Sequence, residues 1–186
     1  HAMFDERVRS VLPRAVMPIA GALARAGVSP NAVSAAAFIV SLAAAWLVAA
    51  GHPQAGILVW LVSRLCDGFD GPVARMAKRS TPFGGYLDIT LDMAAYSIML
   101  MGFAVAHPEH RIVWLVILAG YVLAITTTLA LSNAASAMVR TVGGTDRTFQ
   151  FTPGIAEAGE TTVTYVLWAL LPGWLGWLTW IWAAMI

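Results

Sequence analysis

The sequence predicts an all-α integral membrane protein with six transmembrane helices, preceded by an N-terminal amphipathic helix on the membrane surface. Hydrophobic residues make up 59% of the 186 residues and charged residues only 11%, against about 45–50% and about 25% in soluble globular proteins. Several long segments contain no charged residue at all. This composition excludes a soluble enzyme, a disordered chain and a nucleic-acid-binding protein, and the net charge of +1 indicates no polyanionic partner.

The N-terminal segment differs from the rest of the chain because charged residues are interspersed with apolar ones. Residues 1–3 have the form of a cloning scar, and we expect residues 4–26 to form a basic helix at the membrane interface. A short first span is the alternative, and Pro13 and Pro18 interrupt a straight helix in either case. Residues 27–186 would then form a six-span bundle, so that the whole chain, residues 1–186, is a single membrane domain.

Five apolar segments predict the six spans. Four of them predict one span each: residues 31–51, 54–78, 84–106 and 112–139. The last segment, residues 161–186, contains Pro172 and Gly173 in its middle, and therefore predicts two short helices joined by a tight turn.

The distribution of basic residues predicts the orientation of the spans. Under this topology most Lys and Arg residues share one side of the membrane, and Arg111 falls on the other. Positively charged loops stay in the cytoplasm. Both termini and the loop at residues 79–83 are therefore expected on the cytoplasmic side of what we take to be a bacterial inner membrane.

Four aspartates interrupt the second and third apolar segments: Asp67, Asp70, Asp88 and Asp92. An ionised carboxylate inside the hydrocarbon layer is costly, so these residues are candidates for function. The members of each pair are three or four residues apart, which places each pair on one face of its own helix. Two nearby arginines cannot neutralise four carboxylates, whereas divalent cations can. Carboxylate oxygens favour the hard ions Mg²⁺, Mn²⁺ or Ca²⁺ over zinc, and a pair of such ions suits a diphosphate.

Small and basic residues follow the first pair of aspartates. Gly71 and Ala74 leave space for a ligand, and Arg75 can donate hydrogen bonds to phosphate oxygens. Close helix packing, with Arg75 extended to the interface, is the alternative reading of these residues. Arg64 is expected to pair with an aspartate or reach a phosphate, and Pro72 predicts a kink near residues 68–72.

The same region resembles the pattern of a known family, the CDP-alcohol phosphotransferases. That pattern reads D-x-x-D-G-x-x-A-R-x8-G-x-x-x-D-x-x-x-D, and its fixed positions are met here by Asp67, Asp70, Gly71, Ala74, Arg75, Gly84, Asp88 and Asp92. Ser29-Pro30-Asn31, at the start of the first span, is similar to a Thr/Ser-Pro-Asn element of that family. The predicted six spans and interfacial helix also look like the architecture of that family.

The resemblance implies transfer of a substituted phosphoryl group from a CDP-alcohol, above all CDP-diacylglycerol, to a small polar alcohol, with release of CMP in phospholipid biosynthesis. It implies that Asp67, Asp70 and Asp88 hold two divalent ions, Mg²⁺ or Mn²⁺. Asp92 would complete the second metal site and act as the base for the acceptor hydroxyl. The residues that would bind the CDP group are Asn31, Asp67, Gly71, Ala74, Arg75 and Gly84. The family commonly forms homodimers, so we expect a homodimer here.

Several points remain open in the sequence. Arg140 and Arg147 are candidates for binding an acceptor phosphate, although interfacial charges explain them equally well. The lipid could be the CDP-alcohol or the acceptor.

Two other classes of protein are alternatives to a CDP-alcohol phosphotransferase. They are intramembrane prenyltransferases, which lack the D-G-x-x-A-R run, and cation transporters with an acidic midplane site. For a transferase we expect a polar cavity beside the aspartates, open to the cytoplasm and to lipid.

Overall fold

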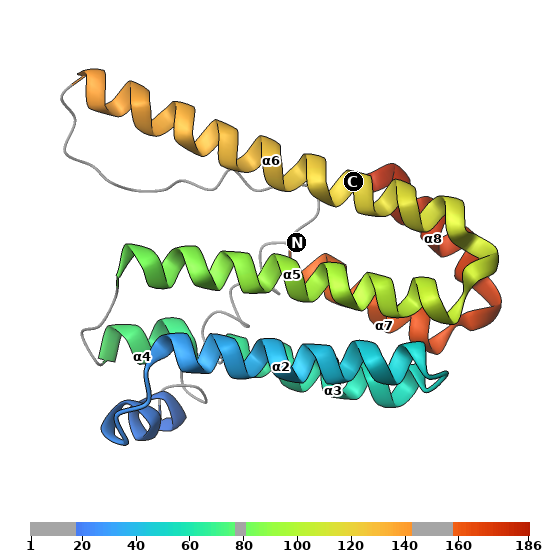
Figure 1. Ribbon diagram of the computed structural model, residues 1–186, viewed down its shortest axis with the longest axis horizontal. Helices are drawn as coiled ribbons and strands as arrows, with labels where there is room; N and C mark the ends of the chain where they lie inside the picture. Colours follow the sequence, from blue (N-terminus) through green and yellow to red (C-terminus); the bar gives the residue numbers. More distant parts are fainter. Residues whose placement is uncertain (1–17, 77–80, 143–157) are drawn as a thin grey trace, which may run out of the picture. The chain divides into compact units, whose positions relative to one another are not determined.

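The structure, a computed structural model, describes residues 18–76, 81–142 and 158–186, and all regular secondary structure in these ranges is helical. A helix over residues 18–25 precedes the elements drawn in Figure 1: α2 (Pro30–Ala49), α3 (Pro53–Asp67), α4 (Asp70–Met76), α5 (Pro82–Ala106), the 3-10 helix η1 (Pro108–His110), α6 (Arg111–Val142), α7 (Ala158–Leu170), the 3-10 helix η2 (Pro172–Trp174) and α8 (Leu175–Met185). The chain divides into two compact units, His1–Gly102 and Phe103–Ile186. The all-α prediction is confirmed over the described residues.

Prolines, glycines and a capping serine set the ends of the helices. The Ser29 hydroxyl accepts a hydrogen bond from the Ala32 N–H at 3.2 Å, and Pro30 occupies the first helical position of α2. After α2, Gly51 adopts a left-handed conformation with φ of +85°, which a residue with a side chain rarely adopts. Pro53 then begins α3. A short turn at residues 50–52 therefore separates α2 from α3.

The second apolar segment is broken into two helices. α3 ends at Asp67 and α4 begins at Asp70, which confirms the predicted kink near residues 68–72. Pro72 lies in the first turn of α4, where its missing N–H would have no intrahelical acceptor. The prediction that Asp67 and Asp70 share one face of a single helix is wrong, because the break places them on two helices.

Small residues allow close approach between the helices of the first unit. A Cβ atom on Gly56 of α3 would lie 2.5 Å from Cγ2 of Val48 and 2.9 Å from the carbonyl oxygen of Ala44, both in α2. A Cβ atom on Gly102 of α5 would lie 2.6 Å from the carbonyl oxygen of Ala45. α3 and α5 therefore both contact α2 at positions that accept only glycine.

The second unit has an aromatic core. The ring of Trp168 in α7 lies 5.5 Å from Phe103 and 5.3 Å from both Trp114 and Tyr165, measured between centroids. Edge-to-face and tilted contacts of this kind add to the stabilisation from burial. α7 and α8 follow directions that differ by 106° across η2, which confirms the prediction of two short helices joined by a tight turn.

Among the described residues, three helices are long and apolar enough to cross a membrane, namely Pro30–Ala49, Phe83–Ala106 and Pro108–Leu131. The bent pair α7 and α8 makes a fourth if it counts as one span. α3 has 15 residues, or about 22 Å, which is short of a bilayer core of about 30 Å. The count of six spans therefore stays a prediction. Residues 4–17 of the predicted interfacial helix lie outside the described residues.

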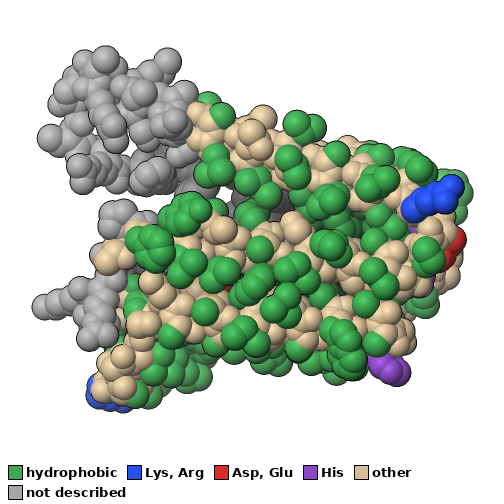
Figure 2. Space-filling view, viewed as in Figure 1, with side chains coloured by type: hydrophobic (Ala, Val, Ile, Leu, Met, Phe, Trp, Pro, Cys, Tyr) green, Lys and Arg blue, Asp and Glu red, His purple; other side chains and the backbone are tan. Residues whose placement is uncertain are grey.

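The surface of the helices is predominantly apolar. Trp46 of α2 and Leu115 of α6 are 69% and 63% exposed, and many other large hydrophobic side chains are similarly exposed. Figure 2 shows hydrophobic side chains over the helices, with the few charged side chains near helix ends. An exposed apolar surface of this extent fits contact with lipid.

Candidate functional site

Arg64 brings two of the predicted site aspartates together. Its Nη1 donates a hydrogen bond to Oδ1 of Asp92, in α5, and lies 3.6 Å from Oδ2 of Asp67, at the end of α3. The exposed fractions of the three side chains are 12% for Arg64, 24% for Asp67 and 20% for Asp92. The expectation that Arg64 pairs with an aspartate is confirmed.

A buried serine pair holds the other end of the Arg64 guanidinium. Nη2 donates hydrogen bonds to the hydroxyl oxygens of Ser41 at 3.3 Å and Ser63 at 3.2 Å. The two hydroxyl oxygens are 2.6 Å apart, and both donate to the carbonyl oxygen of Ala37. α2 and α3 therefore share a polar contact inside an otherwise apolar interface, and this contact orients the guanidinium.

Two aromatic rings flank the same guanidinium. The Cζ atom of Arg64 lies 4.6 Å from the ring centroid of Trp60 and 5.2 Å from that of Tyr96, and these rings meet edge to face. Such cation–π contacts are strongest where the cation is shielded from water. No motif or spacing in the sequence pointed to these two aromatic residues or to the two serines. Hydroxyl groups within apolar helices were the signal available for Ser41 and Ser63.

The predicted CDP-binding residues Asn31 and Gly84 also lie close together. A Cβ atom on Gly84 would be 3.2 Å from Oδ1 of Asn31 and 3.1 Å from Oγ1 of Thr81. The Thr81 hydroxyl accepts a hydrogen bond from the Gly84 N–H at 3.0 Å, at the start of α5. The first turns of α2 and α5 are thus adjacent, and glycine leaves the space between them open.

The remaining predicted residues differ in how far the structure describes them. Asp88 lies one turn before Asp92 in α5, and Ala74 lies in α4; both are half-buried. The structure describes the backbone but not the side chains of Asp70, Arg75 and Arg140, and gives no burial for Gly71. Arg147 lies outside the described residues altogether. Among described residues, no group of three His, Cys, Asp or Glu side chains is arranged to hold a metal ion. Because Asp70 is absent from that set, the four-aspartate metal site stays a prediction.

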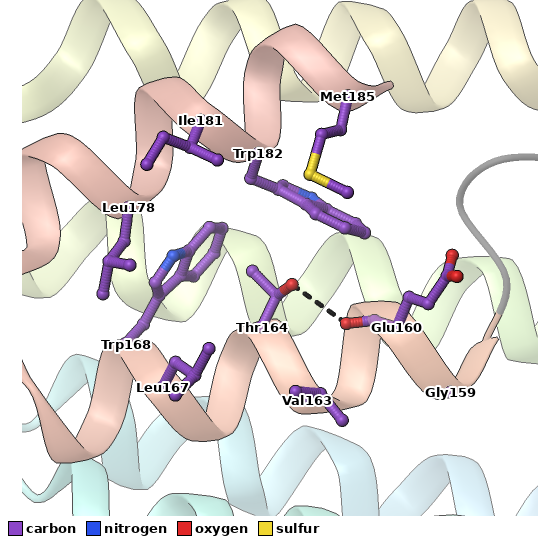
Figure 3. Close-up of a pocket in the computed structure, with 10 residues that line it drawn as sticks. All are labelled: Gly159, Glu160, Val163, Thr164, Leu167, Trp168, Leu178, Ile181, Trp182 and Met185. Atoms are coloured by element: carbon purple, nitrogen blue, oxygen red, sulfur yellow. Dashed lines mark hydrogen bonds between the residues drawn. The ribbon is translucent and has the colours of Figure 1, made fainter. Parts of the chain in front are cut away.

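A cavity that the sequence did not predict lies between α7 and α8. It encloses about 470 Å³ and is lined mainly by apolar side chains, including Leu167, Leu178 and Ile181, with Glu160 near the start of α7 (Figure 3). The indole N–H of Trp168, which also lines it, has no hydrogen-bond partner among the described residues. The polar cavity expected beside the aspartates stays a prediction.

Sequence comparison identifies relatives along most of the chain. A family model described as CDP-alcohol phosphatidyltransferase matches residues 27–185. The inner membrane protein YnjF of Escherichia coli is 31% identical over 167 residues, which cover 88% of this chain and 80% of that protein. A CDP-diacylglycerol–inositol 3-phosphatidyltransferase of Candida albicans is 32% identical over 41% of this chain and 33% of the relative. An archaetidylinositol phosphate synthase of Methanothermobacter thermautotrophicus is 35% identical over 50% of this chain and 47% of the relative.

Solved structures share the fold. The phosphatidylinositol phosphate synthase PgsA1 of Mycobacterium tuberculosis, crystallised with CDP-DAG bound, superimposes with a TM-score of 0.69 and 24% sequence identity, covering 92% of this chain and 87% of that one. The same protein in complex with manganese and citrate gives a TM-score of 0.68, covering 91% of this chain and 82% of that one. At this identity the likeness establishes the fold alone.

Proposed function

The chain belongs to the CDP-alcohol phosphatidyltransferase family, and from this premise we propose that it transfers the phosphatidyl group of CDP-diacylglycerol to a small polar alcohol and releases CMP. The observation that carries the proposal is the convergence of Asp67 and Asp92 on one cation, Arg64. Two carboxylates from different helices that face one positive charge form the kind of oxygen donor set that this chemistry needs.

The donor substrate is supported by the names of relatives. The Candida albicans relative is named for CDP-diacylglycerol and inositol, and the Mycobacterium tuberculosis structure was determined with CDP-DAG. We assign the CDP group to Asn31, Asp67, Gly71, Ala74, Arg75 and Gly84. The closeness of Asn31 and Gly84 supports this assignment, because a cytidine diphosphate can approach helix N-termini only where side chains are small.

Metal ligation is assigned to Asp67, Asp70 and Asp88, with Asp92 completing the second metal site. Carboxylate oxygens suit a hard divalent cation such as Mg²⁺ or Mn²⁺, and the neighbouring structure with manganese supports the same choice. When bound, such ions would neutralise the diphosphate and stabilise the departing CMP.

Asp92 is assigned as the base. Its carboxylate would accept the proton of the acceptor hydroxyl as the hydroxyl oxygen attacks the phosphorus that carries the diacylglycerol group. The bond from that phosphorus to the oxygen of CMP then breaks, and the electron pair leaves with CMP. Arg140 and Arg147 are assigned to bind a phosphate group on the acceptor. Because one of the relatives named above is an archaetidylinositol phosphate synthase, inositol phosphate is the first acceptor to test.

We also propose that the site opens to the cytoplasm and that the protein is a homodimer. The orientation is supported by the Lys and Arg residues of the loops that flank the aspartate-bearing segments. The dimer is supported by the exposed apolar surface, part of which a second copy of the chain could cover within the bilayer. The mass of the detergent-solubilised protein, measured by light scattering, tests the dimer, and a fully active monomer would contradict it.

The proposed reaction is tested with purified protein, CDP-diacylglycerol labelled in the cytidine, and a panel of acceptors that includes inositol phosphate, glycerol phosphate and serine. We expect labelled CMP with at least one acceptor. A parallel reaction with a soluble CDP-alcohol and diacylglycerol tests the reverse assignment of the lipid. CMP in that reaction alone would overturn the donor proposed here, and CMP in neither would favour a cation transporter.

A further inference from the structure

We propose that the short helix at residues 18–25 is a brace that holds α4 in position for binding the CDP group. The brace acts through one contact, in which Gly21 receives the side chain of Met76. The helix lies outside the motif shared with the family and before residue 27, where the match to the family model begins. The inference rests on the proposed function, because it concerns how the nucleotide-binding helix of that reaction is positioned.

The contact between the brace and α4 leaves little space at residue 21. A Cβ atom on Gly21 would lie 3.1 Å from Cε of Met76 and 3.9 Å from its sulfur. Gly21 and its neighbour Ala20 are buried, whereas Ala22 is exposed. One face of the helix is therefore turned toward the protein, and the flexible thioether of Met76 packs against it. Figure 1 shows this helix, in blue, beside α4 at the end of the unit where α2 begins.

Hydrogen bonds fix the link between the brace and α2. The Gly27 N–H donates to the carbonyl oxygen of Ala24, and the Val28 N–H donates to that of Leu23, both at 3.1 Å. Gly27 has a φ of +76°, so these bonds form the Schellman motif that ends a helix. Ser29 then caps α2. A helix whose end is fixed in this way can support α4 rigidly.

α4 is a helix that needs support from its neighbours. It has seven residues, too few for a stable helix in isolation. It contains Gly71, Ala74 and Arg75, which are assigned to the CDP group, and Met76 is its last residue. α4 also contacts α2, and Val73 is fully buried. The brace supplies a second support, at the end of α4 where Met76 lies.

The position of Met76 in α4 predicts which property the brace controls. Ala74 and Arg75 are the nearest assigned residues along the chain. Asp70, which is assigned to metal, begins the helix and lies about 9 Å away along the helix axis. A displacement of the Met76 end therefore moves the CDP-binding residues more than the metal ligand. A general role in folding would not weaken nucleotide binding while leaving metal binding unchanged.

The test enlarges residue 21 and then removes its partner. In Gly21→Leu we expect KM for CDP-diacylglycerol to rise by on the order of tenfold, because small displacements of positioning groups have large effects, while kcat changes little. Binding of CDP-diacylglycerol, measured by calorimetry with Mn²⁺ and without acceptor, should weaken to the same extent. Binding of Mn²⁺ alone, followed by electron paramagnetic resonance, should stay unchanged.

The double variant Gly21→Leu/Met76→Ala tests whether the effect passes through this contact. Because the smaller residue 76 restores the space, KM should return to within about threefold of the wild-type value. Met76→Ala alone removes the contact without adding volume, and we expect it to raise KM by about threefold. Recovery in the double variant is a coupling between two residues that independent effects on stability would not produce.

Two matched variants control for side-chain size. Ala22→Leu adds the same side chain at an exposed position of the same helix and should leave KM unchanged. Leu58→Ala removes an exposed apolar side chain from α3 and is the control for Met76→Ala. Thermal melting shows whether each variant is folded, and Met76→Ala with its control carries the test if Gly21→Leu does not fold.

The outcomes that overturn the brace are specific. They are an unchanged KM in folded Gly21→Leu or in Met76→Ala, an equal rise in Ala22→Leu, and a raised KM that the double variant does not restore. Loss of Mn²⁺ binding in parallel with nucleotide binding would indicate a general distortion and would also contradict it. A wild type that binds CDP-diacylglycerol but releases no CMP with any acceptor would instead defeat the proposed reaction, while the binding measurements would still decide the role of the brace.

Discussion

Individual residues around the aspartates have environments that differ enough to assign separate roles. Asp92 and Asp67 face Arg64, whereas Asp88 lies one turn from Asp92 on α5 and is half-buried. The sequence predicted the aspartates because charge inside an apolar segment is conspicuous. It did not predict Ser41 or Tyr96, which reach Arg64 from other helices through contacts that depend on packing.

Asp88→Asn should abolish detectable transfer. The substitution keeps the size of the side chain but removes the negative charge with which Asp88 is proposed to bind the metal ion. We expect CMP release to fall below detection and Mn²⁺ binding to weaken together. Glu109→Gln, at an exposed carboxylate of η1, is the control and should retain full activity. Near-normal transfer by Asp88→Asn would remove this aspartate from the metal site.

Gly84→Ala should weaken binding of the CDP-alcohol. The new Cβ atom would lie 3.2 Å from Oδ1 of Asn31 and 3.1 Å from Oγ1 of Thr81, so it would fill the space assigned to the nucleotide. We expect KM for CDP-diacylglycerol to rise by roughly tenfold, equivalent to about 1.4 kcal/mol. Gly85→Ala is the control, since no atom lies within 4 Å of its Cβ position. An equal effect of both variants would contradict the account.

At the scale of helices, close packing through glycine connects α5 to α2. Gly102→Ala would place a Cβ atom 2.6 Å from the carbonyl oxygen of Ala45, and the two backbones would have to separate. Overpacking of this kind costs about 1–3 kcal/mol, so the melting temperature in detergent should fall. Gly85→Ala, in the same helix, should leave it unchanged or raise it slightly. A Gly102→Ala protein that melts like the wild type would show that this contact is loose.

Hydrophobic segments and turn residues predicted the helix positions well. The expected segment at 84–106 is observed as α5, Pro82–Ala106, and that at 112–139 as α6, Arg111–Val142. Helical spacing alone misplaced Asp67 and Asp70, because it assumes an unbroken helix across Gly68. The cavity between α7 and α8 depends on a bend of 106°, an angle that no local pattern specifies.

For the molecule as a whole, the exposed apolar surface fits the proposed reaction, because it keeps the protein in the same bilayer as the proposed lipid substrate. Helices with exposed apolar side chains hold the protein in the bilayer, where a diacylglycerol-bearing substrate resides. The residues assigned to the donor and to metal all belong to the first compact unit, within residues 1–102. That unit also contains the buried serine pair and the Arg64 contacts.

The central claim is that the aspartates catalyse divalent-ion-dependent transfer from CDP-diacylglycerol. Its most direct test is the rate of CMP release by the purified wild-type protein, with an acceptor present, before and after excess chelator and again after Mn²⁺ is restored. The account predicts release with Mn²⁺, none with chelator, and recovery on addition of the ion, because the carboxylates need a cation to bind a diphosphate. Full turnover in excess chelator would contradict it.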